Sequence, residues 1–231
     1  MSKCTRTAAL SLVAALTAGP LAAQGFEGVV AYKMMGDNGK SSEMTMSLKG
    51  STMRADMATE GHNMAMLLDG QAQSMTMLMA EQKMYMTMDL KGMREKMQGM
   101  QHQEHTPPKI TALGTKETIA GRSCENFLVE TDKSKMEFCN SKGLGNFLSP
   151  QSPMGRGPSN GLSELNDEMY RTYFKEGFFP LRVTNLDDGK RRVIMEATRV
   201  EPKSLDASLF QIPAGFTEMK MPGGMMPPKH E

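Results

Sequence analysis

The sequence lacks tryptophan, and its 231 residues include only nine phenylalanines and four tyrosines. Basic and acidic side chains nearly balance, which gives a formal net charge of +1 at pH 7. This balance provides no basic surface of the kind that nucleic-acid-binding proteins use, so we expect no nucleic-acid partner. Methionine, in contrast, is in excess, with 26 residues. It therefore takes the place of other apolar side chains as core or cavity filler.

Motifs of catalytic sites are also missing. The sequence has no phosphate-binding P-loop, no GxGxxG after a strand, no zinc-binding HExxH and no redox-active CxxC. The pentapeptide at 157–161 has the GxSxG form, but it continues a stretch rich in Gly, Pro and Ser. A loop is expected there, not the strand-to-helix elbow of a hydrolase. The sequence thus nominates no catalytic residue and no cofactor, and it predicts a protein that is not an enzyme.

The N-terminus has the pattern of a secretory signal peptide. Lys3 and Arg6 form a basic region, residues 8–18 form a short apolar run, and small residues precede an expected cleavage site before Gln24. A lipoprotein would need a cysteine directly after the apolar run, but Cys4 lies before it. We therefore expect residues 1–23 to be removed, leaving a soluble periplasmic protein that is not a lipoprotein.

Cleavage would leave two cysteines, Cys124 and Cys139, in an oxidising compartment where disulfides persist. The segments 125–130 and 136–138 look like strands and flank a turn, so a hairpin would bring the two cysteines close together. The even number of cysteines favours a disulfide between them. Two reduced, buried thiols are the alternative.

Methionine recurs at every second position in several runs between Met34 and Met100. A period of two is the side-chain period of a β-strand, so each run puts its thioethers on one face. Turn signals such as Asp69-Gly70 separate the runs. The pattern predicts an antiparallel meander with one methionine-covered face. Its expected strands span residues 26–35, 42–49, 52–58, 64–68, 71–79 and 83–89.

The pattern changes after residue 89, where methionine recurs every three or four residues, which suits a short helix or a mobile connector. A second helix with an apolar face is expected at 162–173. Further strands are expected at 110–117, 125–130, 136–138, 180–185 and 191–200. We therefore expect one β-rich domain over 24–218, followed by a disordered tail over 219–231 that is rich in Pro, Gly and Met.

Several short fragments occur in an order that resembles a known family. They are residues 26–28 (FEG), 49–54 (KGSTMR), 81–86 (EQKMYM), 119–124 (IAGRSC) and 208–216 (SLFQIPAGF). Together they resemble an uncharacterised family of exported bacterial proteins catalogued as domain of unknown function 4412. That family is similar to the periplasmic lipoprotein carriers LolA and LolB. The resemblance covers nearly all of the mature chain.

The resemblance implies a mainly β (α+β) fold of the LolA type. This fold is a strongly curved antiparallel sheet, an unclosed half-barrel, whose concave face is covered by one or two helices. In the carriers the hollow receives acyl chains. The resemblance therefore implies an apolar or lipid-like ligand and transient contact with cell-envelope membranes or lipoproteins. It implies no catalytic residues.

The methionine face has three interpretations. In the first, the thioethers simply fill a core against the helix at 162–173. In the second, they line a cavity for an apolar ligand, because methionine is flexible and re-packs around guests of varied shape. We take non-catalytic binding of an apolar or lipid-like molecule as the expected function. The expected lining residues are Met44, Met46, Met53, Met64, Met66, Met75, Met77, Met84 and Met86.

The third interpretation is binding of a soft metal ion such as Cu(I), which thioethers favour. Methionines two apart on one strand share a face, with Cα atoms about 6.5–7 Å apart. The densest local cluster adds imidazoles to thioethers and comprises Met93, Met97, Met100, His102 and His105. Reversible oxidation of exposed methionine to the sulfoxide, as an oxidant buffer, is a related alternative.

Overall fold

The protein is described here from a computed structural model, which describes residues 25–36, 39–59, 62–92, 108–132, 134–145, 172–174 and 177–219. The predicted signal peptide at 1–23 lies outside these residues. So do residue 24 of the predicted domain, the predicted tail beyond residue 219 and most of the helix predicted at 162–173.

The first half of the chain forms six strands joined in sequence. They are β1 (Gly28–Met35), β2 (Ser41–Lys49), β3 (Thr52–Thr59), β4 (His62–Asp69), β5 (Ser74–Met79) and β6 (Met84–Asp89). Each pairs antiparallel with the next, which confirms the meander predicted from the period-two pattern. One expected strand was too long, because residues 71–73 belong to the turn and β5 begins only at Ser74. Asp69 accepts the amide hydrogens of Gln71 and Ala72 and holds this turn.

The second half adds another antiparallel series. It contains β7 (Lys109–Ile119), β8 (Arg122–Glu130), β9 (Lys135–Asn140), β10 (Pro180–Asn185), the 3-10 turn η3 (Asp187–Gly189) and β11 (Arg192–Pro202). The turn between β7 and β8 consists of Ala120 and Gly121, both with positive φ (50° and 76°). Two positive φ values are what a two-residue hairpin turn that matches strand twist requires. The fragment at 119–124 is therefore a hairpin.

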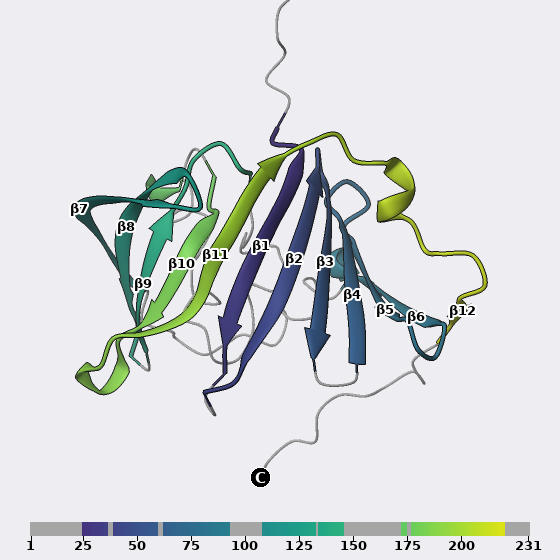
Figure 1. Cartoon of the computed structure of the whole chain (residues 1–231), viewed down its shortest axis with the longest axis horizontal. Coiled ribbons are helices and arrows are strands. Elements are labelled where there is room, and N and C mark those ends of the chain that lie inside the picture. The colour runs from purple at the N-terminus through teal and green to yellow at the C-terminus, as the bar shows by residue number, and fades with distance from the viewer. Residues whose placement is uncertain are drawn as a thin grey trace, which may run out of the picture.

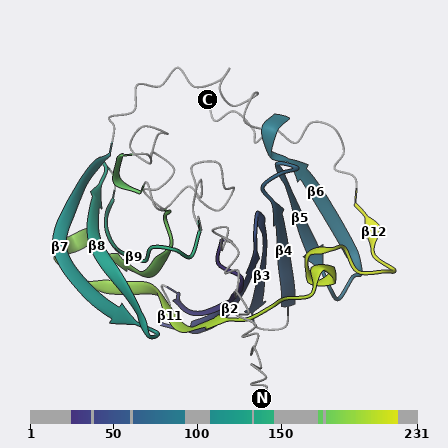
Figure 2. The same cartoon turned by 90° about the horizontal axis from the view of Figure 1, so that it is seen from above.

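The two series join into a single 12-stranded sheet, because β1 pairs with β11. The sheet order is β12-β6-β5-β4-β3-β2-β1-β11-β10-β9-β8-β7, and β7 and β12 (Thr217–Glu218) form its two edges. Figure 1 shows the strands side by side, and Figure 2 shows that the sheet curves strongly without closing. The predicted mainly β, unclosed curved sheet is thus confirmed. The sheet is mixed, however, since β12 runs parallel to β6.

Helices contribute little to the part of the chain that the structure describes. Beyond the 3-10 turns η3 and η4 (Ala207–Phe210), helical backbone occurs only at 90–92 and 172–173. Residues 172 and 173 are the last two positions of the range 162–173 in which a helix was predicted. None of the helices among the described residues has the length and apolar character needed to cross a membrane.

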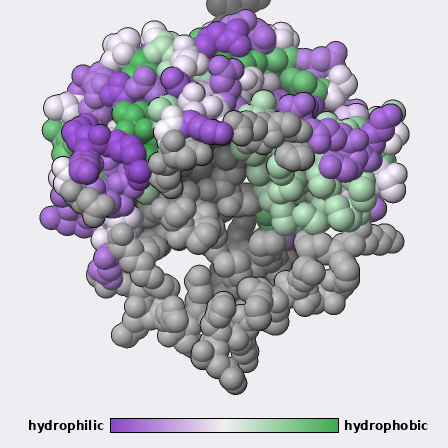
Figure 3. All heavy atoms as spheres, turned by 60° about the horizontal axis from the view of Figure 1, so that its bottom comes forward, coloured by the Kyte–Doolittle hydropathy of each residue, from purple (hydrophilic) through white to green (hydrophobic). Residues whose placement is uncertain are grey.

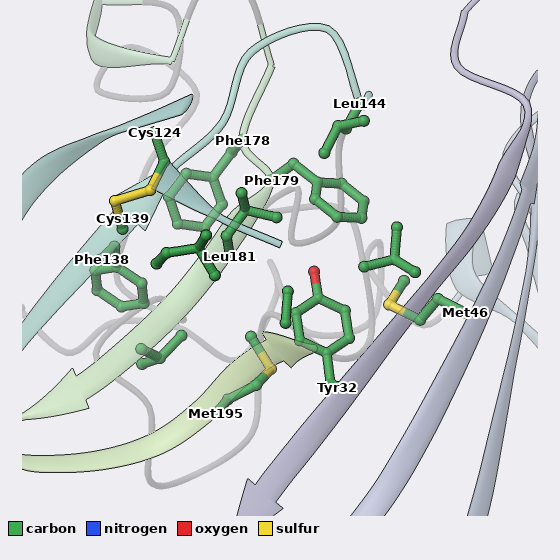
Figure 4. Close-up of a cluster of buried hydrophobic side chains, with 14 of the residues drawn as sticks. Tyr32, Met46, Cys124, Phe138, Cys139, Leu144, Phe178, Phe179, Leu181 and Met195 are labelled. Carbon is green, nitrogen blue, oxygen red and sulfur yellow. A yellow bond between two sulfur atoms is a disulfide. The ribbon is translucent and has the colours of Figure 1, made fainter. Parts of the chain in front are cut away.

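One half of the concave face is a filled aromatic core. Phe178 and Phe179 are fully buried and lie against side chains of the central strands (Figure 4). Asn140 holds this segment, because its side chain accepts the amide hydrogen of Phe179 at 2.6 Å and donates to the Gly177 carbonyl at 3.1 Å. The buried Tyr32 hydroxyl donates to the Pro180 carbonyl at 3.0 Å. Burial raises the Tyr32 pKa well above its usual value, so this donor keeps its proton.

The predicted disulfide between Cys124 and Cys139 is present. It joins the neighbouring strands β8 and β9, with Cα atoms 5.2 Å apart, and both cysteines are buried (Figure 4). It therefore cross-links the strands that carry the aromatic core.

Replacing both cysteines with alanine should lower the free energy of unfolding by about 3 kcal/mol. The bridge spans 15 residues, and closing such a loop removes that much conformational freedom from the unfolded chain in the entropy model. Urea unfolding of the double variant beside the oxidised wild type measures the difference. Reduced wild-type protein is the matched control and should unfold with the double variant. Equal stability of all three proteins would contradict the prediction.

The convex face of β3–β6 is covered by the C-terminal segment. Arg54 on β3 donates to the Leu209 carbonyl at 3.2 Å. At the edge of the sheet, the Thr217 and Met219 amides donate to the Lys83 and Tyr85 carbonyls and anchor the end of this segment beside β6. Phe216 packs with Tyr85 against a small buried cluster of Ala65, Leu67 and Leu78. These contacts bury apolar side chains on the convex side of β4–β6. The strands therefore remain packed on one side even where their concave side is partly exposed.

Candidate functional site: a methionine-covered sheet face

Strand register arranges methionine in three rows across β2, β3, β4, β5 and β6. Directly opposed residues share a face, so each row lies on one side of the sheet. The first row is Met44, Met57, Met64, Met79 and Met84; the second is Met46, Ala55, Met66, Met77 and Met86; the third is Leu48, Met53, Leu68, Met75 and Met88. Twelve of these fifteen positions are methionine, and the whole set is called the methionine face below.

All nine residues that the sequence nominated as a lining lie on the methionine face. The structure adds Met57, Met79 and Met88, which follow the same alternation but were not among the nominated residues. Met44, Met46 and Met53 belong to the same buried cluster as Phe178 and Phe179, so the methionine face is on the concave side. Leu67 and Leu78 alternate with it and lie under Phe216 on the convex side.

Burial changes across the methionine face. Met44, Met46, Met53 and Met75 are at most 5% exposed, and the first three pack against the aromatic core. The other methionines of the face are only partly buried. They are Met57, Met64, Met66, Met77, Met79, Met84, Met86 and Met88. Figure 3 shows a pale green apolar patch on the side of the molecule where β4–β6 lie. The methionine face therefore has a filled inner part and an accessible outer part.

A cavity of about 380 Å³ adjoins the third row, at the end of the sheet where β2 turns into β3 and β4 into β5. Leu48, Met53 and Leu68 of that row line it, together with Leu90 and Leu144. Its polar lining comes from the two turns, mainly Ser51, Thr52, Asp69, Gln71 and Gln73. The arrangement is an apolar floor with polar groups at the rim, continuous with the methionine face.

A partly buried ion pair between Lys49 and Glu27 lies beside this cavity and positions the N-terminal residues that line it. Lys49 donates to the Glu27 carboxylate at 2.8 Å and to the Leu205 carbonyl, and the Leu205 amide also donates to Glu27. Hydrogen bonding from Lys49, followed by that from Leu205, lowers the Glu27 pKa below its usual value. Glu27 therefore stays ionised at neutral pH. The network ties residue 27, next to the cavity-lining Phe26, to both β2 and the C-terminal segment.

The nominated metal cluster of Met93, Met97, Met100, His102 and His105 lies outside the described residues. Within the described ranges, His, Cys, Asp and Glu side chains nowhere gather three or more in a metal-binding arrangement. The methionine pairs two apart, such as Met64 with Met66 and Met84 with Met86, do share a face, as predicted. The thioethers are thus brought together on the sheet, and the sequence signal for this was the period of two.

Limited oxidation should separate the two parts of the methionine face. Brief treatment with hydrogen peroxide is expected to convert Met77, Met79, Met84 and Met86 to sulfoxides well before Met44 and Met46, since oxidation follows exposure. Peptide mass spectrometry at several time points measures the order. Unfolded protein is the control, and there all these methionines should react at similar rates. Equal rates in the folded protein would contradict the burial described above.

The model of the family described as "Domain of unknown function (DUF4412)" matches residues 26–216. No curated protein sequence matches the chain significantly. Among solved structures, PNGF-II in its C2 crystal form is 11% identical, with a TM-score of 0.48 over 86% of this chain and 31% of that chain. An uncharacterised conserved protein from Thermus thermophilus is 8% identical, with a TM-score of 0.49 over 84% of this chain and 90% of that chain. The chain thus spans about a third of the length of PNGF-II.

Proposed function

The chain belongs to the DUF4412 family, and we propose that it is an exported, non-catalytic binding protein that holds an apolar or lipid-like molecule on the methionine face. The ligand lies on the outer, partly exposed methionines and reaches the cavity beside the third row. The proposal rests on one observation above all. Twelve methionines occupy one side of five adjacent strands, and eight of them are not fully buried.

The methionine face is large enough to bind such a molecule. Its accessible part spans β4, β5 and β6, and three strands about 4.8 Å apart with three rows about 6.6 Å apart give roughly 10 by 13 Å, or about 130 Å². At about 25 cal/mol per Å², covering that area contributes on the order of 3 kcal/mol before the costs of association, and the apolar surface that the ligand itself buries adds to it. Together these contributions suit reversible binding of one apolar molecule.

Methionine suits this role better than a branched side chain. Its unbranched thioether has three rotatable bonds, so a methionine surface adjusts to ligands of different shape. Surfaces of this kind serve proteins that accept several partners. A core that only had to be filled would gain more order from leucine, isoleucine and valine. The partly exposed rows on β4–β6 therefore favour ligand binding over simple core packing.

The cavity supports the same proposal. Its volume of about 380 Å³ lies within the range of small-molecule sites, which combine an apolar lining with a few polar groups. Leu48, Met53 and Leu68 belong both to the cavity and to the third row. A ligand with an apolar chain and a polar end would lay its chain along the rows and its polar end beside Ser51 and Asp69.

Two further features support an exported carrier related to LolA. The disulfide suits an oxidising compartment, in agreement with the signal peptide expected at 1–23. The unclosed, curved sheet with an apolar hollow is the arrangement that the resemblance to lipoprotein carriers implies. We therefore propose a periplasmic protein that makes transient contact with membranes or lipoproteins of the cell envelope.

The direct test is titration of the mature protein with a fluorescent fatty acid. The proposal predicts saturable binding by one or a few molecules per chain, and displacement of the probe by an unlabelled fatty acid. Urea-unfolded protein is the control and should not show saturable binding. Absence of saturable binding to the folded protein would overturn the proposal and leave the methionine face as core.

A further inference from the structure

We propose that the outer part of the methionine face is also a binding site for a soft monovalent cation, Cu(I) or its analogue Ag(I). The site consists of Met64 on β4, Met77 and Met79 on β5, and Met84 and Met86 on β6. Register aligns Met64 with Met79 and Met79 with Met84, and aligns Met77 with Met86. Five thioethers thus come from three adjacent strands.

The backbone geometry brings these sulfurs within reach of one ion. Directly opposed residues on antiparallel strands have Cα atoms about 4.5–5.5 Å apart, and residues two apart on one strand have Cα atoms about 6.5–7 Å apart. The long, flexible methionine side chain covers such separations. Three of the five thioethers, one from each strand, can therefore turn toward a common point above β5.

The chemistry of this donor set selects the ion. Thioether sulfur is a soft, uncharged ligand that favours Cu(I) over hard divalent ions such as Mg²⁺ and Ca²⁺. β5 contains no Asp or Glu, and the residues that alternate with these methionines, such as Leu78 and Tyr85, face the opposite side of the sheet, so no carboxylate of β5 competes with the sulfurs. A weakly hydrated monovalent cation is the ion that such a site can hold.

Burial places the site on the outer part of the methionine face and not on the inner part. All five methionines are partly exposed, so an ion from solvent reaches them and their side chains have room to rotate. Met44 and Met46 are at most 1% exposed and pack in the cluster around Tyr32, where turning a sulfur toward an ion would open a void. Met53 and Met75 are also buried and lie in the third row.

The test is calorimetric titration of the mature, oxidised protein with silver nitrate in chloride-free buffer. The disulfide removes Cys124 and Cys139 as competing thiols. The triple variant M64L/M79L/M84L should lose at least tenfold in Ag(I) affinity for this site. The control triple M46L/M53L/M75L removes three methionines outside the site and should bind Ag(I) as the wild type does. Leucine is close in volume to methionine, so both variants should fold.

Fatty-acid titration of the same proteins separates the two proposals. Leucine keeps the methionine face apolar, so both triples should bind the fatty-acid probe like the wild type whether or not Ag(I) binds. No saturable Ag(I) binding by the wild type, or equal binding by M64L/M79L/M84L and the wild type, would overturn the metal site. An equal loss in both triples would overturn it as well. If the wild type binds Ag(I) but shows no saturable binding of the fatty acid, only the proposal of an apolar ligand is overturned.

Discussion

The triple variant M66Q/M77Q/M86Q should bind a fluorescent fatty acid at least tenfold more weakly than the wild type. These residues form the central row of the accessible methionine face, directly opposed on β4, β5 and β6. Glutamine has nearly the shape of methionine but carries an amide, which must lose its water when an apolar chain covers it. A tenfold loss corresponds to about 1.4 kcal/mol, a modest part of what three desolvated amides cost. Fluorescence titration of the folded variant measures the change.

The matched variant M66L/M77L/M86L separates apolar contact from any other role of these side chains. Leucine remains apolar, so its affinity for the fatty acid should stay within a few-fold of the wild type. Both variants should keep most of their stability, because the three methionines are only partly buried. Equal fatty-acid affinity in the glutamine and leucine variants would mean that the ligand does not contact this row.

Replacing Phe178 with alanine should lower the free energy of unfolding by about 3–5 kcal/mol. Phe178 is fully buried, and its ring centroid lies 4.4 Å from that of Phe174 and 5.6 Å from that of Phe138. Its removal loses apolar burial, leaves a cavity and breaks two aromatic contacts. Urea unfolding with the disulfide intact measures the difference.

Two comparisons show whether this loss comes from the core. Tyr173 is 40% exposed and lies in the same segment, so Tyr173→Ala should cost less than about 1 kcal/mol. Under conditions where Phe178→Ala remains folded, it should still bind the fatty acid, because the aromatic core occupies the other half of the concave face. A loss below about 1 kcal/mol for Phe178→Ala would contradict the filled core described here.

Local sequence patterns predicted the strands and the side of the sheet that each residue faces, because both depend on residues close together in the chain. Alternation of Met44 with Thr45 and of Met77 with Leu78 determines which side each residue takes, and the short turns at residues 50–51 and 70–73 align neighbouring strands. The cysteine pair was also predictable, because Cys124 and Cys139 flank one hairpin. The motif at 119–124 contains the turn that precedes β8, the strand that carries Cys124.

Long-range pairing could not be read in the same way. The pairing of β1 with β11 joins residues about 170 positions apart, and no local pattern specifies it. The parallel pairing of β12 with β6 and the packing of Phe216 on Leu78 also join residues that are far apart in the sequence. In consequence, the sequence did not show that the convex side of β4–β6 is covered. A cavity was predicted, but its place at the turn end of the sheet was not, since it depends on Leu90 and Leu144 approaching the third row, and of the nominated methionines it is Met53 that lines it.

The most direct test of the central claim is mass spectrometry of small molecules extracted from the native protein, purified without detergent from cells that produce it. If the methionine face encloses an apolar site, the extract should contain an acyl chain or a comparable apolar compound in near-stoichiometric amount, and M66Q/M77Q/M86Q should carry far less of it. An empty extract, together with no response of the folded protein to a hydrophobic dye, would contradict the claim and assign these thioethers to packing alone.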